Sequence, residues 1–179
     1  MPSTKSLVNP TYTPMSLPPG GFKTFQSFYP FYLGEHSLPT TRRLHLIGTS
    51  IAVTSFTRVT LSLIPIVLTG LARSVPAPSK NNGINPLQPS HTGTGPGPFN
   101  NLKLSYQLAY YAMKFRFLDL TRSEAITWLA GGVVGAYAFA WISHFFVEKN
   151  KPATFKYPVW SLRGDLKMWW EVITLQRDF

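Results

Sequence analysis

Apolar residues are concentrated in two long runs of the chain. The first, residues 42–72, begins with Arg42 and Arg43 and is then mainly apolar and β-branched, with Arg58 near its centre and Pro65 further on. The second, residues 125–147, contains no Asp, Glu, Lys or Arg. A helix needs about 20 predominantly apolar residues to cross the hydrocarbon core of a bilayer. Both runs therefore predict membrane-spanning helices.

Arg58 leaves two interpretations of the first run open. A lone arginine at the bilayer centre costs about 2.5–3.5 kcal/mol on insertion scales. Either its side chain faces a polar interior, or the run folds as two short, re-entrant or interfacial pieces. We expect one tilted helix with an inward-facing Arg58. In the second run, Gly131 and Gly135 form a small-xxx-small pair that would let another helix approach closely.

Three shorter segments have the pattern of helices that lie at a membrane surface. Residues 22–33 are densely aromatic with an expected break at Pro30, residues 102–120 have one apolar face with basic residues elsewhere, and residues 165–179 are amphipathic. Packing on the rest of the protein is the alternative for residues 102–120. The predicted fold is an all-α integral membrane protein. It is a helical hairpin of two long membrane helices, open to further short or re-entrant ones, with interfacial amphipathic helices.

Proline, glycine and serine mark the parts of the chain that we expect to lack helix. Residues 1–21 are rich in Pro, Ser and Thr and predict a disordered N-terminal tail. A Pro/Gly-rich linker occupies about residues 73–101 and contains His91, which we expect to be a solvated loop residue. The remaining chain, residues 22–179, is predicted to form a single membrane-embedded domain interrupted by this linker.

Three of the four histidines converge if the two long runs form a hairpin. His36 and His45 lie at the start of the first helix and His144 lies at the end of the second, so all three are on one side of the membrane. Neutral imidazoles suit Fe, Zn, Cu or Ni, and Glu35 or Glu148 would supply a carboxylate ligand or hold a ligating histidine in place. The alternative is a set of interfacial histidines bonded to backbone or lipid phosphate.

The charge of the chain indicates an anionic partner. The net charge is +10, which suits nucleic acid or an anionic membrane surface. We favour the bilayer over nucleic acid because the basic residues cluster beside apolar runs. Five of them lie on the histidine side, which the positive-inside rule makes cytosolic together with both termini: Arg42, Arg43, Lys149, Lys151 and Lys156. The chain has no cysteine, which excludes disulfides and thiolate metal sites.

Two stretches resemble the signature blocks of a known family. FYPFYLGEHSLPTTRRLHLIGT (residues 28–49) and YAFAWISHFFVEKNKPATFKYPVWSLRGDLKMWW (residues 137–170) are similar to the two blocks of the fungal 2-hydroxy fatty acid dioxygenases. The resemblance implies a multi-pass protein of the endoplasmic-reticulum membrane. It also implies Fe(II)-dependent cleavage of a 2-hydroxy fatty acid, such as 2-hydroxypalmitate, by O2. The product would be an acid one carbon shorter, formed in alpha-oxidation during phytosphingosine breakdown.

The same resemblance assigns expected roles to the residues of the cytosolic side. His36, His45 and His144 match the signature histidines and are the expected iron ligands, and Glu148 is a further expected catalytic residue. An iron site with three protein ligands leaves coordination positions open.

The substrate carboxylate is expected to be neutralised by Arg42, Arg43 or Lys149. The oligomeric state is left open. Two other functions fit the sequence: a non-catalytic hairpin that shapes or anchors to the membrane, and a metal-dependent lipid hydrolase.

Overall fold

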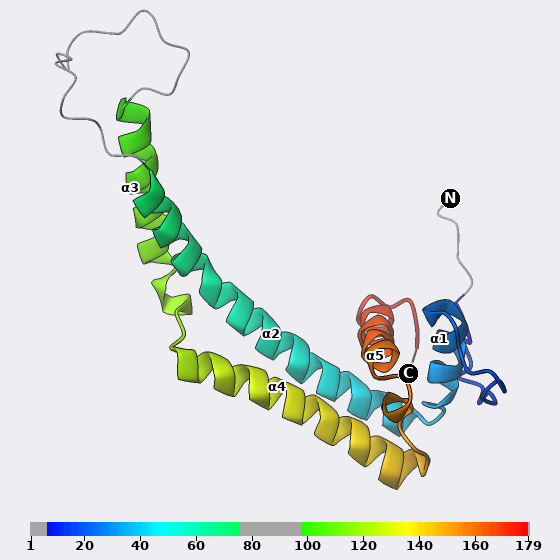
Figure 1. Ribbon diagram of the computed structural model, residues 1–179. Helices are drawn as coiled ribbons and strands as arrows, with labels where there is room; N and C mark the ends of the chain where they lie inside the picture. The colour runs from blue at the N-terminus through cyan, green and yellow to red at the C-terminus, as the bar shows by residue number, and fades with distance from the viewer. Residues whose placement is uncertain (1–6, 76–97, 179) are drawn as a thin grey trace, which may run out of the picture. The chain divides into compact units, whose positions relative to one another are not determined.

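The computed structural model describes residues 7–75 and 98–178, and it is helical with no strand among these residues (Figure 1). This confirms the predicted all-α fold. The main helices, in chain order, are α1 (Phe25–Gly34), α2 (Pro39–Ser74), α3 (Pro98–Lys114), α4 (Arg122–Ile142) and α5 (Pro158–Ile173). Between them lie two 3-10 turns and a π-helix, namely η1 (Arg116–Leu118), η3 (Ala153–Phe155) and η2 (Ser143–Glu148).

Two helical stretches are long and apolar enough to cross a membrane: α2, and α4 continued by η2. Only 17% and 6% of the residues in their most apolar windows are buried, so their apolar side chains face outward, unlike those of a core helix in a soluble protein. α2 runs unbroken past Arg58 and Pro65, which confirms the single-helix interpretation. The Arg58 guanidinium donates to the backbone oxygen of Leu118 at 2.7 Å.

The described chain divides into two compact units. The first comprises Met1–Phe56 and Thr127–Phe179, and the second comprises Thr57–Ile126. α1, α5 and the histidines His36, His45 and His144 belong to the first unit, and α3 belongs to the second.

Within the first unit, α2 and α4 pack closely through glycines. A Cβ added at Gly132 would lie 2.6 Å from the Cβ of Ser55, and one at Gly135 would lie 3.1 Å from a methyl group of Ile51. Gly131, in contrast, has nothing within 4 Å. The predicted close contact through Gly131 was therefore wrong, and the contact face of α4 passes through the neighbouring glycine instead.

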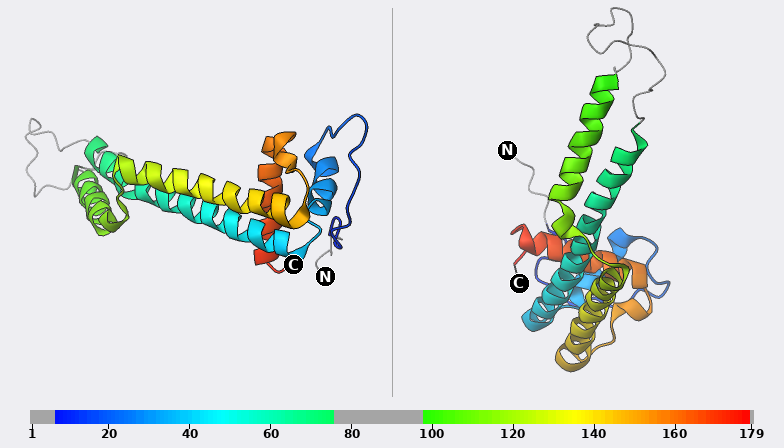
Figure 2. Two further views of the ribbon diagram at one scale, coloured as in Figure 1. Left: turned by 90° about the horizontal axis from the view of Figure 1, so that it is seen from below. Right: turned by 90° about the vertical axis from the view of Figure 1, so that its left-hand side faces the viewer.

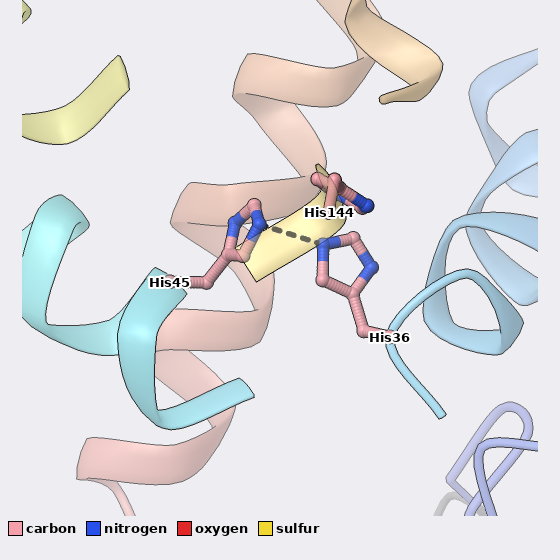
Figure 3. Close-up of side chains that lie close together, drawn as sticks. All are labelled: His36, His45 and His144. Carbon is pink, nitrogen blue, oxygen red and sulfur yellow. Dashed lines mark hydrogen bonds between the residues drawn. The ribbon is translucent and has the colours of Figure 1, made fainter. Parts of the chain in front are cut away.

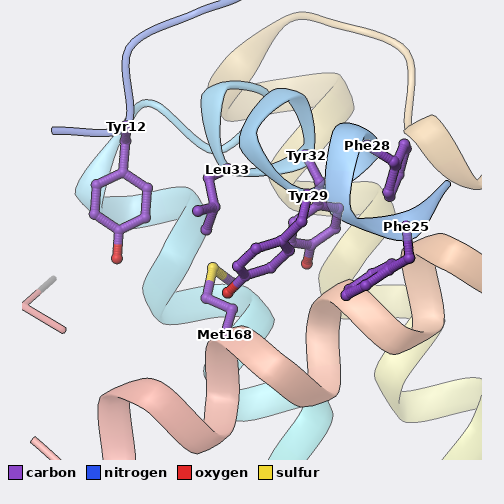
Figure 4. Close-up of a cluster of buried hydrophobic side chains, with 7 residues drawn as sticks. All are labelled: Tyr12, Phe25, Phe28, Tyr29, Tyr32, Leu33 and Met168. Carbon is purple, nitrogen blue, oxygen red and sulfur yellow. The ribbon is translucent and has the colours of Figure 1, made fainter. Parts of the chain in front are cut away.

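The hydrophobic core of the first unit lies between α1 and α5, which run beside each other (Figures 1 and 2). α1 contributes the buried rings of Phe28 and Tyr32, and α5 contributes Met168 (Figure 4). Gly164 lets α5 approach α1, because a Cβ there would lie 2.9 Å from the Tyr32 ring. The break expected at Pro30 was wrong: α1 continues through this proline, since burial of the aromatic face outweighs one missing hydrogen bond.

The chain before α1 contacts the same core. Tyr12 is buried and its hydroxyl donates to the backbone oxygen of Asp178 at 2.8 Å. The Arg42 guanidinium stacks 3.8 Å from the Tyr12 ring centre. The disordered tail predicted for residues 1–21 lies partly outside the described residues, and its described part makes these contacts. Most of the predicted linker, with His91, also lies outside the described residues.

Candidate metal centre

Three histidines from three different elements meet in the first unit (Figure 3). His36 lies in the turn after α1, His45 lies near the start of α2, and His144 lies in the π-helix η2. All three side chains are buried, and one ring nitrogen from each lies within 4.8 Å of the other two. The ring centres are 4.3–5.0 Å apart. The convergence predicted from the hairpin topology is confirmed.

The turn that carries His36 is held by two charged side chains. Arg42 donates to the backbone oxygens of His36 at 2.8 Å and Ser37 at 2.6 Å. Glu148 accepts the backbone N–H of Leu38 at 2.7 Å, just before the first residue of α2. A carboxylate in this position satisfies a free N–H and is stabilised by the helix dipole. Both side chains thereby fix the path of the chain between His36 and α2.

A change of helix type brings His144 to the cluster. α4 gives way to the π-helix at Ser143, and π-turns occur frequently at functional sites. The widened turn closes where Lys149 adopts a left-handed conformation with φ 56°. The backbone N–H of Asn150 then bonds to the backbone oxygen of His144 at 3.0 Å. This places the Asn150 side chain back against the His144 ring.

Each imidazole is oriented by an acceptor at Nδ1. His36 faces the backbone oxygen of Tyr32 at 2.6 Å, His45 faces Oδ1 of Asp165 at 2.6 Å, and His144 faces Oδ1 of Asn150 at 2.7 Å. The backbone oxygen and the carboxylate can only accept. The amide of Asn150 is oriented because its Nδ2 donates to the backbone oxygen of Glu35 at 3.2 Å. Every Nδ1 must therefore carry the proton, which leaves the Nε2 lone pairs free.

The converging ring nitrogens make a site suited to a cation. The Nε2 atoms of His36 and His45 lie 3.2 Å apart, where two lone pairs repel each other unless a positive charge lies between them. Burial, and next the neighbouring imidazoles, hold the pKa of His36 well below its usual range, which disfavours a proton in that role. Two nitrogens bound to one metal ion at about 2.1 Å are about 3.0–3.4 Å apart. The donor set thus fits a metal ion, with Nδ1 partners of the kind that orient ligating histidines.

The other predicted site residues surround the cluster with different contacts. Glu148 bonds to the start of α2 and lies outside the group of three potential ligands. Arg42 is buried, and its Nε has no hydrogen-bond partner among the described residues. Arg43 and Lys149 are exposed beside the buried histidine cluster. Glu35 is half-buried, and burial followed by the charge of Glu148 raises its pKa. The catalytic and substrate-binding roles of these residues stay predictions.

Sequence reasoning missed Asp165 and Asn150, which orient two of the histidines. A signal for Asp165 was present, because it falls in register with the buried positions Ser161, Met168 and Val172 of α5. A lone carboxylate on the buried side of an amphipathic helix indicates a specific partner. Asn150 gives no comparable signal, since asparagine after a helix is ordinary capping chemistry.

Comparison with known protein families gives one match, which spans nearly the whole described chain. Residues 22–177 match the family described as Mpo1-like, 2-hydroxy-palmitic acid dioxygenase Mpo1-like. The matched range includes α1, the three histidines, Asp165 and α5. Neither the curated proteins nor the solved structures gave a match.

Proposed function

Because the chain belongs to the Mpo1-like family, we propose that it is an Fe(II)-dependent dioxygenase of 2-hydroxy fatty acids. It converts a substrate such as 2-hydroxypalmitate to the fatty acid one carbon shorter, as in alpha-oxidation and phytosphingosine degradation. The observation that carries this proposal is the set of three buried histidines that each bring a ring nitrogen within 4.8 Å of the other two. The reaction balances as R–CH(OH)–COOH + O2 → R–COOH + CO2 + H2O.

In this proposal His36, His45 and His144 hold the iron through Nε2. Iron(II), when bound, supplies the one-electron chemistry that the reaction of O2 with an organic acid requires. Three protein ligands leave coordination positions for the hydroxyl and carboxylate of the substrate and for O2. Tyr32 and Asp165 act behind His45: the Tyr32 hydroxyl donates to the Asp165 carboxylate at 2.5 Å, and that carboxylate keeps the His45 proton on Nδ1.

Basic side chains beside the cluster would hold the substrate carboxylate. Arg43 and Lys149 are exposed, so they are accessible to an acid that arrives from the membrane surface. The Arg42 guanidinium is already fixed by two backbone oxygens, so it contributes a permanent positive charge rather than a mobile clamp. Glu148 is assigned to the turn that carries His36, from where it supports catalysis indirectly.

The membrane setting completes the proposal. Residues 22–179 would form a single membrane-embedded catalytic domain of the endoplasmic-reticulum membrane, with both termini in the cytosol. The two helices that are long and apolar enough to span a bilayer support this placement. The histidine cluster lies at one end of each helix, at Pro39–His45 and at His144. Basic residues lie at the same ends, and such residues are typical of the cytosolic side of a membrane protein.

Alanine substitutions of the three histidines test this function and should have the largest effect on iron content and turnover. Each of His36→Ala, His45→Ala and His144→Ala should remove most of the iron and essentially all turnover, because a three-ligand site has no spare donor. The measurements are iron per protein, O2 uptake and pentadecanoic acid formed from 2-hydroxypalmitate. His91→Ala is the control and should change none of them.

Two outcomes would contradict the proposal. A folded His144→Ala protein that keeps iron and activity would refute the site. Wild-type protein that retains its metal and releases lipid fragments without O2 uptake would instead identify a metal-dependent hydrolase. Gel filtration in detergent checks that each variant is folded.

A further inference from the structure

A small cavity adjoins the histidine cluster on the side of the membrane helices. Its volume is about 70 Å³. His45 and Asp165 form its polar end. The rest of the lining comes from α2, α4, α5 and η3: Thr49, Ala52, Ala136, Tyr137, Ala140, Thr154, Pro158, Leu162 and Leu166. The cavity therefore joins the histidine cluster to a mostly apolar wall.

The lining follows the axis of α2 away from the metal centre. His45, Thr49 and Ala52 are spaced by four and three residues, so they share one face of the helix. Ala136 and Ala140 share a face of α4 in the same way and lead toward His144 at the next turn. Small side chains on both helices leave room beside the metal centre. A larger residue at any of these positions would fill a cavity of this size.

The cavity has an apolar rim. Leu162 and Leu166 of α5 are 60% and 44% exposed, and Tyr137 of α4 is 40% exposed. α4 is one of the two helices that are apolar and outward-facing enough to span a membrane. An opening bounded by such a helix and by exposed leucines is suited to hydrocarbon rather than to water.

We propose that this cavity receives the first carbons of the substrate's acyl chain and that the rest of the chain leaves sideways between α4 and α5 into lipid. This inference rests on the proposed function. The cavity has only about the volume of two or three liquid water molecules, so a long chain cannot be enclosed. The 2-hydroxy acid head group would lie at His45, and the chain would pass Ala136 and Ala140 toward Leu162.

The proposed path of the acyl chain can be tested by a charged substitution at the rim of the cavity, compared with a matched charged substitution elsewhere on α5. Leu162→Asp places a carboxylate where the chain would pass. Val159→Asp, one turn away, places the same charge at a residue that is 73% exposed and does not line the cavity. Relative to Val159→Asp, Leu162→Asp should lower kcat/KM for 2-hydroxypalmitate by about tenfold or more, because a charge in the chain's path must be desolvated. It should spare 2-hydroxybutanoate, whose short chain ends inside the cavity.

Photolabelling gives a readout that needs no turnover. A 2-hydroxy fatty acid with a diazirine near the carboxyl end should label peptides with residues 136–140 and 162–166. The label should be lost in Leu162→Asp and kept in Val159→Asp. A diazirine at the far end of the chain should instead label lipid. Iron content, measured in parallel, should be equal in both variants because neither residue belongs to the group of potential ligands.

The two proposals fail in different ways. Wild-type protein that turns over no 2-hydroxy acid, yet shows the labelling described, would refute the reaction and keep the acyl site. Turnover that falls equally in Leu162→Asp and Val159→Asp, or labelling outside both peptides, would overturn the acyl path and leave the reaction standing. A kcat/KM that depends steeply on the far end of long chains would also overturn it, because that end lies in lipid.

Discussion

The two units differ in which side chains they bury. In the first unit, histidine, arginine and glutamate side chains are buried and hydrogen-bonded, as His36, Arg42 and Glu171 show. In the second unit, the described residues leave large apolar side chains exposed, such as Ile66 at 58% and Phe117 at 75%. Arg58, in this unit, is half-buried and donates to the backbone oxygen of Leu118.

This difference indicates that polar side chains are held in fixed positions mainly in the first unit. Burying a polar group is unfavourable unless it is fully hydrogen-bonded, so a dense buried network is kept where it positions something. Exposed apolar side chains, in contrast, are stable without partners in lipid. We therefore expect substitutions of polar residues to be severe in the first unit and mild in the second.

The largest effect on stability should come from Glu171. Its carboxylate accepts from Tyr29 at 2.7 Å and from the buried Arg177 at 2.8 Å. Glu171→Leu leaves the Arg177 charge buried without its partner and should lower the free energy of unfolding by about 3–5 kcal/mol. Unfolding of the detergent-solubilised protein by titration with SDS measures this loss.

Glu124→Leu is the matched change in the second unit. Glu124 is exposed and forms a capping box with Thr121 at the start of α4. Losing this contact should cost much less than Glu171→Leu, because both groups stay exposed to water. Equal losses in the free energy of unfolding for the two variants would show that the buried network of the first unit stabilises the fold no more than a surface helix cap does.

The second prediction concerns the carboxylate behind His45. Asp165→Asn replaces an obligatory acceptor by an amide, which can offer N–H to Nδ1 and so move the imidazole proton onto Nε2. We expect the affinity for the proposed iron to be about 10–100-fold lower. Competition with a chelator measures the affinity. Asp119→Asn, an exposed carboxylate of the second unit, should leave it unchanged. An equal affinity in wild type and Asp165→Asn would mean that Asp165 has no role in orienting His45.

The sequence predicted the helices and the meeting of the histidines because both follow from long-range patterns. Two apolar runs joined by a linker set the topology, and the topology places His36 and His144 on the same side. The patterns did not determine details that depend on helix rotation. The apolar run gives the same signal all around α4, so it could not distinguish Gly131 from Gly132. Asn150 reaches His144 only because of the π-helix, and nothing in the local sequence signals that widened turn.

The glycines of α4 provide the third prediction. Gly132→Ala places a Cβ 2.6 Å from that of Ser55, and separating the helices should cost about 1–3 kcal/mol. Gly131→Ala meets nothing within 4 Å and should stabilise the protein by up to about 1 kcal/mol through helix propensity. SDS titration of the two variants measures the difference. Matching stabilities would mean that α2 and α4 do not pack through this face.

The smallest expected effect is the pH dependence of the buried network. Burial alone would raise the pKa of Glu171, but hydrogen bonds from Lys167, Arg177 and Tyr29 outweigh it and hold that pKa below its usual range. A carboxylate with a depressed pKa stabilises the fold fully above its unfolded pKa of about 4.3. This stabilisation is lost as the pH falls through the lower pKa of the folded state.

Glu35 should show the opposite sign, because burial and then the charge of Glu148 raise its pKa. Its charge opposes folding at neutral pH, and protonation on mild acidification relieves this cost. Between pH 7 and pH 4, wild-type stability should therefore rise relative to Glu35→Gln, and below about pH 4.3 it should fall relative to Glu171→Gln, because neither glutamine titrates. SDS titrations of the three proteins at each pH measure both slopes. Slopes of the same sign would show that the two carboxylates do not lie in the different environments that their contacts indicate.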